Sequence, residues 1–153
     1  QYVYQSLNIK KQIVREDPFD FGKRQLLNFG HTIAHALENA YGYRLSHGNT
    51  VVIGIIVESF LSVRKNLLSR SSFEKIQEIF SFLGMIPRLK KSIEKQEFFN
   101  ALFFDKKNKE GTVHTVLIEE IGKCYQENDR FSFPLSKDDL EEAFAFFQEK
   151  FLC

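Results

Sequence analysis

Apolar residues recur along most of the chain at the spacing of amphipathic helices. The first segment, Tyr2–Arg15, places four of them among polar residues: Val3, Leu7, Ile9 and Ile13. Asp17-Pro18 ends this pattern, because proline disfavours a helical conformation in the residue before it. The next segment, Lys23–Tyr41, is predicted as one continuous helix that stops at Gly42.

A third helix is predicted from Val51 to about Asn66, with Asn49 or Thr50 as its N-cap. Its first residues are apolar almost all round, which is typical of a helix buried on every side. The β-branched residues in this run could also form a strand. The length of the apolar stretch favours a helix.

The second half of the chain contains shorter elements. Three more helices are predicted: one with Ser71 or Ser72 as its cap and Gly84 after its end, one over about Ile93–Phe103, and one over Asp138 to about Phe151 with a capping box of Ser136 and Asp139. Thr112–Ile118 is predicted as a strand that pairs with Gly122–Tyr125 across a turn. No linker divides the chain. The pattern therefore predicts one mainly α, multi-helical domain over residues 1–153 with a small β-hairpin.

Charge and composition narrow the function classes. The formal net charge is +1, so the chain lacks the basic footprint of a nucleic-acid-binding protein. No apolar run reaches the roughly 18 residues of a membrane span. The two cysteines suggest no disulfide framework, which favours a cytoplasmic protein. Because the first residue is Gln1, we expect the chain to be part of a longer protein.

The segment Lys23–Tyr41 also carries an unusual set of polar residues. Arg24, Asn28, His31 and His35 follow one another at intervals of four, three and four. In a continuous helix these intervals place all four side chains on one face. Burying such groups without partners costs roughly 1 to 3 kcal/mol each, so we expect them to line a wet cleft or to hold a ligand.

These residue types suit an anionic ligand and a metal. Arginine binds carboxylate or phosphate with a fixed fork of donors, and neutral histidine binds divalent metals or moves protons. His47 follows soon after, and a short loop can bring it close to His31. Two imidazoles would form a partial zinc site that needs a further ligand. The alternative interpretation, that histidines four residues apart are structural, stays open for each histidine taken singly.

Taken together, these residues resemble a known family signature. The stretch Arg24-x-x-x-Asn28-Phe29-Gly30-His31-Thr32-x-x-His35-Ala36-x-Glu38, followed by His47-Gly48, is similar to that of 3-dehydroquinate synthases. The resemblance extends over almost the whole chain, through Lys10 upstream and, downstream, Asp105-Lys106-Lys107-Asn108, Val116-Leu117-Ile118 and Ile121-Gly122-Lys123. Asp20 departs from the family, which usually has Glu at this position.

The resemblance implies an enzyme of the shikimate pathway. Family members convert the sugar acid phosphate DAHP to 3-dehydroquinate with elimination of phosphate. They use tightly bound NAD and one divalent metal, zinc or cobalt, and they are usually homodimers. The resemblance further implies an N-terminal NAD-binding domain, which this chain does not contain. We therefore expect the isolated chain to be inactive and to bind zinc weakly.

The resemblance also implies a role for each matching residue. His31 and His47 would bind the metal, and both would lie against the substrate. His35 and Asp20 would act in proton transfer. The remaining matched residues would hold polar groups of the substrate: Lys10, Arg24, Asn28, and a lysine of the pair Lys106 and Lys107.

Three other interpretations compete with this one. The first is another sugar phosphate cyclase, of the deoxy-inosose or valiolone type, which shares the histidines of the metal site. The second is a non-catalytic helical interaction module, in which the polar residues would point in different directions. The third, a helical His-Asp phosphohydrolase, is disfavoured because the chain contains no His-Asp dipeptide.

Overall fold

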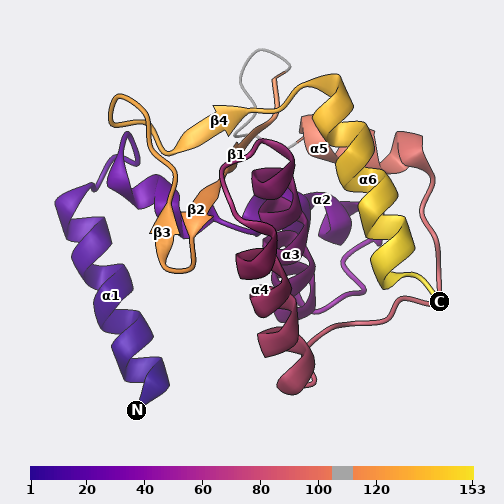
Figure 1. Ribbon diagram of the computed structural model, residues 1–153, viewed down its shortest axis with the longest axis horizontal. Coiled ribbons are helices and arrows are strands. Elements are labelled where there is room, and N and C mark those ends of the chain that lie inside the picture. The colour runs from indigo at the N-terminus through magenta and orange to yellow at the C-terminus, as the bar shows by residue number, and fades with distance from the viewer. Residues whose placement is uncertain (105–111) are drawn as a thin grey trace.

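The computed structural model describes residues 1–104 and 112–153, and it is mainly helical (Figure 1). Within these ranges no helix is both long and apolar enough to cross a membrane. The predominance of helices confirms the mainly α fold class predicted from the sequence. Lys106 and Lys107 lie outside the described residues.

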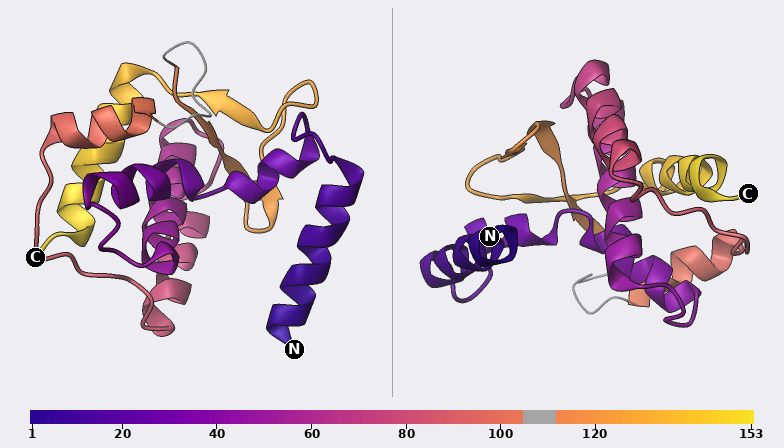
Figure 2. Two further views of the ribbon diagram at one scale, coloured as in Figure 1. Left: turned by 180° about the vertical axis from the view of Figure 1, so that it is seen from behind. Right: turned by 90° about the horizontal axis from the view of Figure 1, so that it is seen from below.

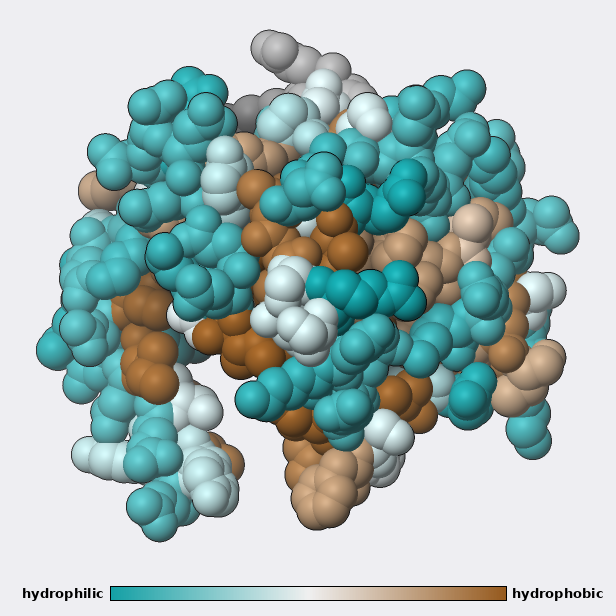
Figure 3. Space-filling view, viewed as in Figure 1, coloured by the Kyte–Doolittle hydropathy of each residue, from teal (hydrophilic) through white to brown (hydrophobic). Residues whose placement is uncertain are grey.

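Helix α1 (Tyr2–Glu16) stands apart at the N-terminal end of the molecule and contacts the 3₁₀ helix η1 (Lys23–Asn28) (Figures 1 and 2). The predicted helix is confirmed, but it buries no residue within this chain. Its apolar residues Val3, Leu7 and Ile9 remain exposed. Figure 3 shows hydrophobic surface (brown) beside the hollow that separates α1 from the rest of the domain.

Two helices form the centre of the domain: α2 (His31–Ala40) and α3 (His47–Arg64). They touch where Gly30, just before α2, meets Gly54 in the middle of α3. A Cβ atom on Gly54 would overlap the carbonyl oxygen of Gly30, and one on Gly30 would lie 2.6 Å from Ile55 Cγ1. Gly30 also has φ of 81°, a conformation that glycine adopts at little cost. Both glycines are therefore needed for this close approach.

This contact corrects the prediction of one helix over Lys23–Tyr41. The chain forms η1, turns at Phe29 and Gly30, and only then enters α2. The spacing of residues in the sequence cannot reveal such a break, because the number of residues per turn in a 3₁₀ helix is close to that in an α-helix. Arg24 and Asn28 therefore do not continue the face of His31 and His35.

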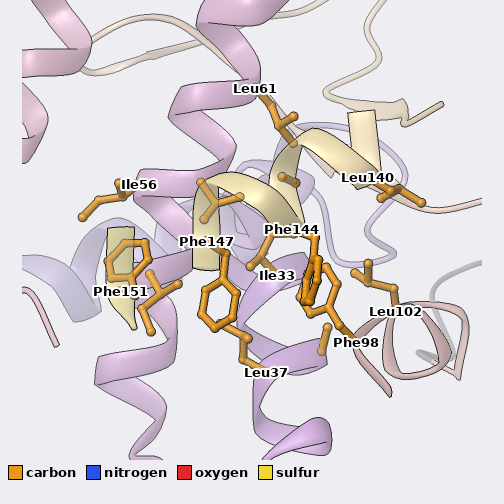
Figure 4. Close-up of a cluster of buried hydrophobic side chains, with 14 of the residues drawn as sticks. Ile33, Leu37, Ile56, Leu61, Phe98, Leu102, Leu140, Phe144, Phe147 and Phe151 are labelled. Carbon is orange, nitrogen blue, oxygen red and sulfur yellow. The ribbon is translucent and has the colours of Figure 1, made fainter. Parts of the chain in front are cut away.

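Three further helices cover the central pair: α4 (Arg70–Phe82), α5 (Lys95–Phe104) and α6 (Lys137–Phe151). Four phenylalanines form the centre of the core, where they face Ile33 and Leu37 of α2 and Ile56 and Leu61 of α3 (Figure 4). They are Phe98 of α5 with Phe144, Phe147 and Phe151 of α6. Packing of α2 against these aromatic residues holds the helix that carries two of the candidate site residues.

Serine side chains cap three of the helices. The capping box of Ser136 and Asp139 is present at α6, as predicted. The other two caps lie earlier than predicted: Ser46 accepts from the backbone N–H of Asn49 at α3, and Ser69 accepts from that of Ser72 at α4. The start of α3 at His47, and not at Val51, places this histidine in a fixed first turn.

Two small antiparallel sheets lie beside the helices. A small hairpin is present, as predicted, but its strands are β2 (Ile118–Glu120) and β3 (Lys123–Cys124), so the first strand lies later than the predicted Thr112–Ile118. Strand β1 (His114–Val116) pairs instead with β4 (Ser132–Pro134), which the sequence did not reveal. Residues 112–118, predicted as one strand, thus contribute to two different sheets.

The close approach of Gly30 and Gly54 leads to a first prediction. Gly54→Ala should lower the free energy of unfolding by about 3 kcal/mol, because the new methyl group meets backbone that cannot move without separating α2 from α3. Urea denaturation would measure the change. Gly48→Ala, in the same helix, is the matched control, since its Cβ would meet nothing within 4 Å. Equal stability of the two variants would contradict the role of this contact.

Candidate functional site

Three histidine rings converge where α2 and α3 begin. His31 and His35 lie one turn apart on α2, and His47 is the first residue of α3. The ring centroids lie 5.4 Å apart for His31 and His47, 5.7 Å for His31 and His35, and 6.4 Å for His35 and His47. The convergence of the three rings, which the sequence predicted, is therefore present in the structure.

His47 is held by a carboxylate from the neighbouring helix. Its Nδ1 lies 2.7 Å from Glu38 Oε1, and Thr50 Oγ1 donates to the same oxygen at 2.9 Å. Burial alone would raise the pKa of Glu38, but the hydrogen bonds from His47 and Thr50 hold that pKa below its ordinary value. Glu38 is therefore a carboxylate that can only accept, so Nδ1 of His47 carries the hydrogen.

His31 is oriented in a similar way by the backbone. Its Nδ1 lies 3.1 Å from the carbonyl oxygen of Phe29, which can only accept a hydrogen bond. In the neutral rings of His31 and His47, Nε2 is then the unprotonated nitrogen. Metal-binding histidines commonly donate their other ring N–H to a carboxylate or a carbonyl, and this pattern fits both residues.

A fully buried carboxyl group lies beneath this cluster. Glu58, on α3, is 0% exposed, and its oxygens accept from the backbone N–H of Gly30 at 2.7 Å and of Ile33 at 3.3 Å. Burial raises the pKa of Glu58 to about 8, although the hydrogen bond from Gly30 acts in the opposite direction. Sequence reasoning missed this residue. Its signal was a single charged residue within the apolar stretch of α3.

The loop between α1 and η1 is organised by Asp17. Its carboxylate accepts from the backbone N–H groups of Phe21, Gly22 and Arg24. Burial would raise the pKa of Asp17, but these hydrogen bonds hold it below its ordinary value. Asp20 lies in this loop with φ of 61°, and its buried Oδ1 has no hydrogen-bond partner among the described residues.

Three further candidate substrate-binding residues, Lys10, Arg24 and Asn28, lie on α1 and η1, outside the two helices that carry the histidines. The guanidinium of Arg24 donates to the carbonyl oxygen of Pro18 at 2.9 Å, within the loop before η1. Asn28 is the last residue of η1, three positions before His31. Lys10 is exposed on α1, and no described interaction joins it to the histidines.

The donor set fits part of a metal site. Neutral imidazoles are common zinc ligands, and His31 and His47 are oriented through their Nδ1 atoms as such ligands usually are. Within residues 1–104 and 112–153, no group of three or more His, Cys, Asp or Glu could hold a metal ion.

Comparison with known proteins identifies the family. The family described as 3-dehydroquinate synthase C-terminal matches residues 1–108. The chain belongs to this family. It is 39% identical to the 3-dehydroquinate synthase of Streptococcus thermophilus over 80% of this chain and 34% of that protein. It is 34% identical to that of Campylobacter jejuni over 97% of this chain and 41% of that protein.

Solved structures of sugar phosphate cyclases share the fold. A 2-deoxy-scyllo-inosose synthase complexed with carbaglucose-6-phosphate, NAD+ and Co2+ aligns with a TM-score of 0.80 at 23% identity, over 92% of this chain and 39% of that one. A 2-epi-5-epi-valiolone synthase from Streptomyces hygroscopicus with NAD+ and Zn2+ bound aligns with a TM-score of 0.70 at 23% identity, over 90% and 37%. The chain thus spans about two fifths of these enzymes.

The buried carboxyl of Glu58 should make the stability of the domain depend on pH. Because its folded pKa of about 8 lies above the ordinary 4.5, the native state keeps a proton that the unfolded chain releases between these values. The stability from this group is complete below pH 4.5 and is lost as pH rises through 8, at up to about 1.4 kcal/mol per pH unit.

Urea denaturation of the wild type and of Glu58→Gln, over that pH window, would measure this dependence. Glutamine cannot release the proton, so the variant should lack this part of the pH dependence. Parallel curves for the two proteins would show that the pKa of Glu58 does not differ between the folded and the unfolded chain.

Proposed function

We propose that this chain is the metal- and substrate-binding part of a 3-dehydroquinate synthase, an NAD- and metal-dependent lyase that converts DAHP to 3-dehydroquinate and releases phosphate. The observation that carries the proposal is the convergence of His31, His35 and His47 at the meeting of α2 and α3. A helical interaction module would have no reason to bring three imidazoles together or to orient two of them through Nδ1.

His31 and His47 are the proposed metal ligands. Each has its Nδ1 engaged by an oxygen acceptor, which leaves Nε2 as the coordinating atom of the neutral ring. A bound zinc or cobalt ion would supply Lewis acidity toward a substrate hydroxyl. The protein's part is to hold the two rings in fixed orientation before the metal arrives.

His35 is proposed to transfer a proton close to the substrate. Its ring lies within 6.4 Å of both other rings, so a substrate at the metal-binding histidines would also be near His35. Neutral histidine can accept a proton and return it near neutral pH. Asp20 is proposed as a second group in proton transfer, and its buried, unpartnered Oδ1 supports a ligand contact.

The substrate is a sugar acid phosphate, and its charges call for cationic and polar partners. Arg24, Asn28 and Lys10 are proposed to bind its polar groups, together with Lys106 or Lys107. In the described structure the guanidinium of Arg24 is bonded to the Pro18 carbonyl. This bond engages one nitrogen of the guanidinium, and the remaining N–H donors of Arg24 could bind an anion.

NAD and the remaining metal ligand are proposed to come from an N-terminal domain. The relatives are two to three times longer than this chain, and two of the structural neighbours have NAD+ bound. The exposed apolar residues of α1 support a contact with such a domain. We propose that the complete enzyme is a homodimer, as in the family generally.

Another sugar phosphate cyclase is the second candidate. The structural neighbours are of this kind, but at 23% identity they support the fold alone. The relatives at 34% and 39% identity are all 3-dehydroquinate synthases, which favours DAHP as the substrate.

Phosphate release by the complete protein, with NAD and zinc present, would test the proposal. DAHP should be converted, and glucose 6-phosphate should not be. His31→Ala should abolish both bound metal and turnover, because it removes one imidazole ligand, while circular dichroism should still report folded helices. Turnover retained by His31→Ala would refute the ligand role, and conversion of glucose 6-phosphate alone would favour the second candidate.

Glu38 offers a separate test of the metal site. Glu38→Gln should weaken zinc binding by the complete protein about 10- to 100-fold, because the carboxamide orients the His47 ring less strongly than a carboxylate. Isothermal titration with zinc would measure the loss. Glu142→Gln is a matched control, since Glu142 binds Arg64 on the surface, away from the histidines. Unchanged zinc affinity in Glu38→Gln would contradict the arrangement.

A further inference from the structure

Glu58 is a charged residue type at a fully buried position of the core. A carboxyl group that is completely buried is costly, and the proposed function gives this one no role in binding substrate or metal. It lies on α3, 11 residues after His47, and bonds across to the neighbouring helix. Its partners include the backbone N–H groups of Gly30 and Ile33, which lie on either side of His31 and Thr32 in the sequence.

The start of α2 explains why this position needs an acceptor. The first N–H groups of a helix have no partner within it, and a side chain at the N-cap usually satisfies one of them. The N-cap of α2 is Gly30, which has no side chain to do so. A longer residue cannot replace it, because Gly30 has φ of 81° and packs against Ile55. The cap must therefore come from another element.

We propose that Glu58 is a positioning residue that caps α2 from α3 and thereby fixes His31 relative to His47. One rigid helix carries both His47 and Glu58. The carboxyl of Glu58 holds both ends of the short segment that contains His31. The distance between the two rings is therefore set through α3, and metal affinity depends on it. The consequence for metal binding rests on the proposed function, whereas the placement of the rings does not.

The closest control is Ser62, one turn further along α3. It is also completely buried. Its hydroxyl accepts from the backbone N–H of Ile118 and donates to the backbone carbonyl of Glu58, not to its carboxyl group. Ser62 thus ties α3 to β2 in the way that Glu58 ties it to α2. Loss of either side chain removes buried hydrogen bonds, but only loss of Glu58 removes the bonds to the start of α2 and should move His31.

The test is the nuclear Overhauser effect between the ring protons of His31 and His47, whose centroids lie 5.4 Å apart. In the chain of residues 1–153, Glu58→Met keeps the length of the side chain and removes both acceptors. This variant should lose at least half of the effect, whereas Ser62→Ala should keep it. An unchanged effect in Glu58→Met, or an equal loss in both variants, would overturn the proposal.

A second measurement covers the case in which Glu58→Met does not fold. In the wild type, the amides of Gly30 and Ile33 should exchange with solvent at least 100-fold more slowly than in an unfolded peptide, because Glu58 holds them. Exchange at the unfolded rate would overturn the proposal.

Zinc affinity of the complete protein separates this proposal from the proposed function. Glu58→Met should bind zinc at least tenfold more weakly than the wild type and Ser62→Ala. If the wild type binds no zinc, the proposed metal site fails, and the ring and amide measurements still decide the role of Glu58.

Discussion

The close contact between the turn before α2 and the middle of α3 is the constraint on which the arrangement of this domain depends. Gly30 and Gly54 allow two backbones to approach at a distance that any side chain would prevent. The approach brings the first residue of α2 near the first turn of α3, where His47 lies. The histidine cluster is thus a product of helix packing, and it does not require a loop to hold it.

The core on the far side of α2 also holds the histidines in place. Four phenylalanines from α5 and α6 pack against Ile33 and Leu37, which alternate along the helix with His31 and His35. One helix therefore has a face fixed in a rigid aromatic core and a face that presents imidazoles. Interiors pack at nearly crystalline density, so a residue on such a helix has little freedom to shift. Functional groups on rigid elements are held more precisely than groups on loops.

The sequence predicts the elements of this fold better than their connections. The last helix, predicted from Asp138 to about Phe151, and its capping box at Ser136 rest on local signals, and both are confirmed. The break at Gly30 and the strand at Ser132–Pro134 were missed, because each depends on a partner distant in sequence: Gly54 for the first and β1 for the second. The roles of the site residues remain predictions.

Glu58 shows what the sequence alone can indicate about a buried polar residue. A single carboxylate in an apolar helix indicates a buried polar group that must be satisfied. The sequence does not identify the hydrogen-bond partner, because this could be any donor that the fold brings near. The structure shows that the donors are backbone amides of the helix that begins with His31. In the proposed role, a carboxyl group outside the site determines its geometry, because Glu58 bonds to the start of α2 and shares the rigid helix α3 with His47.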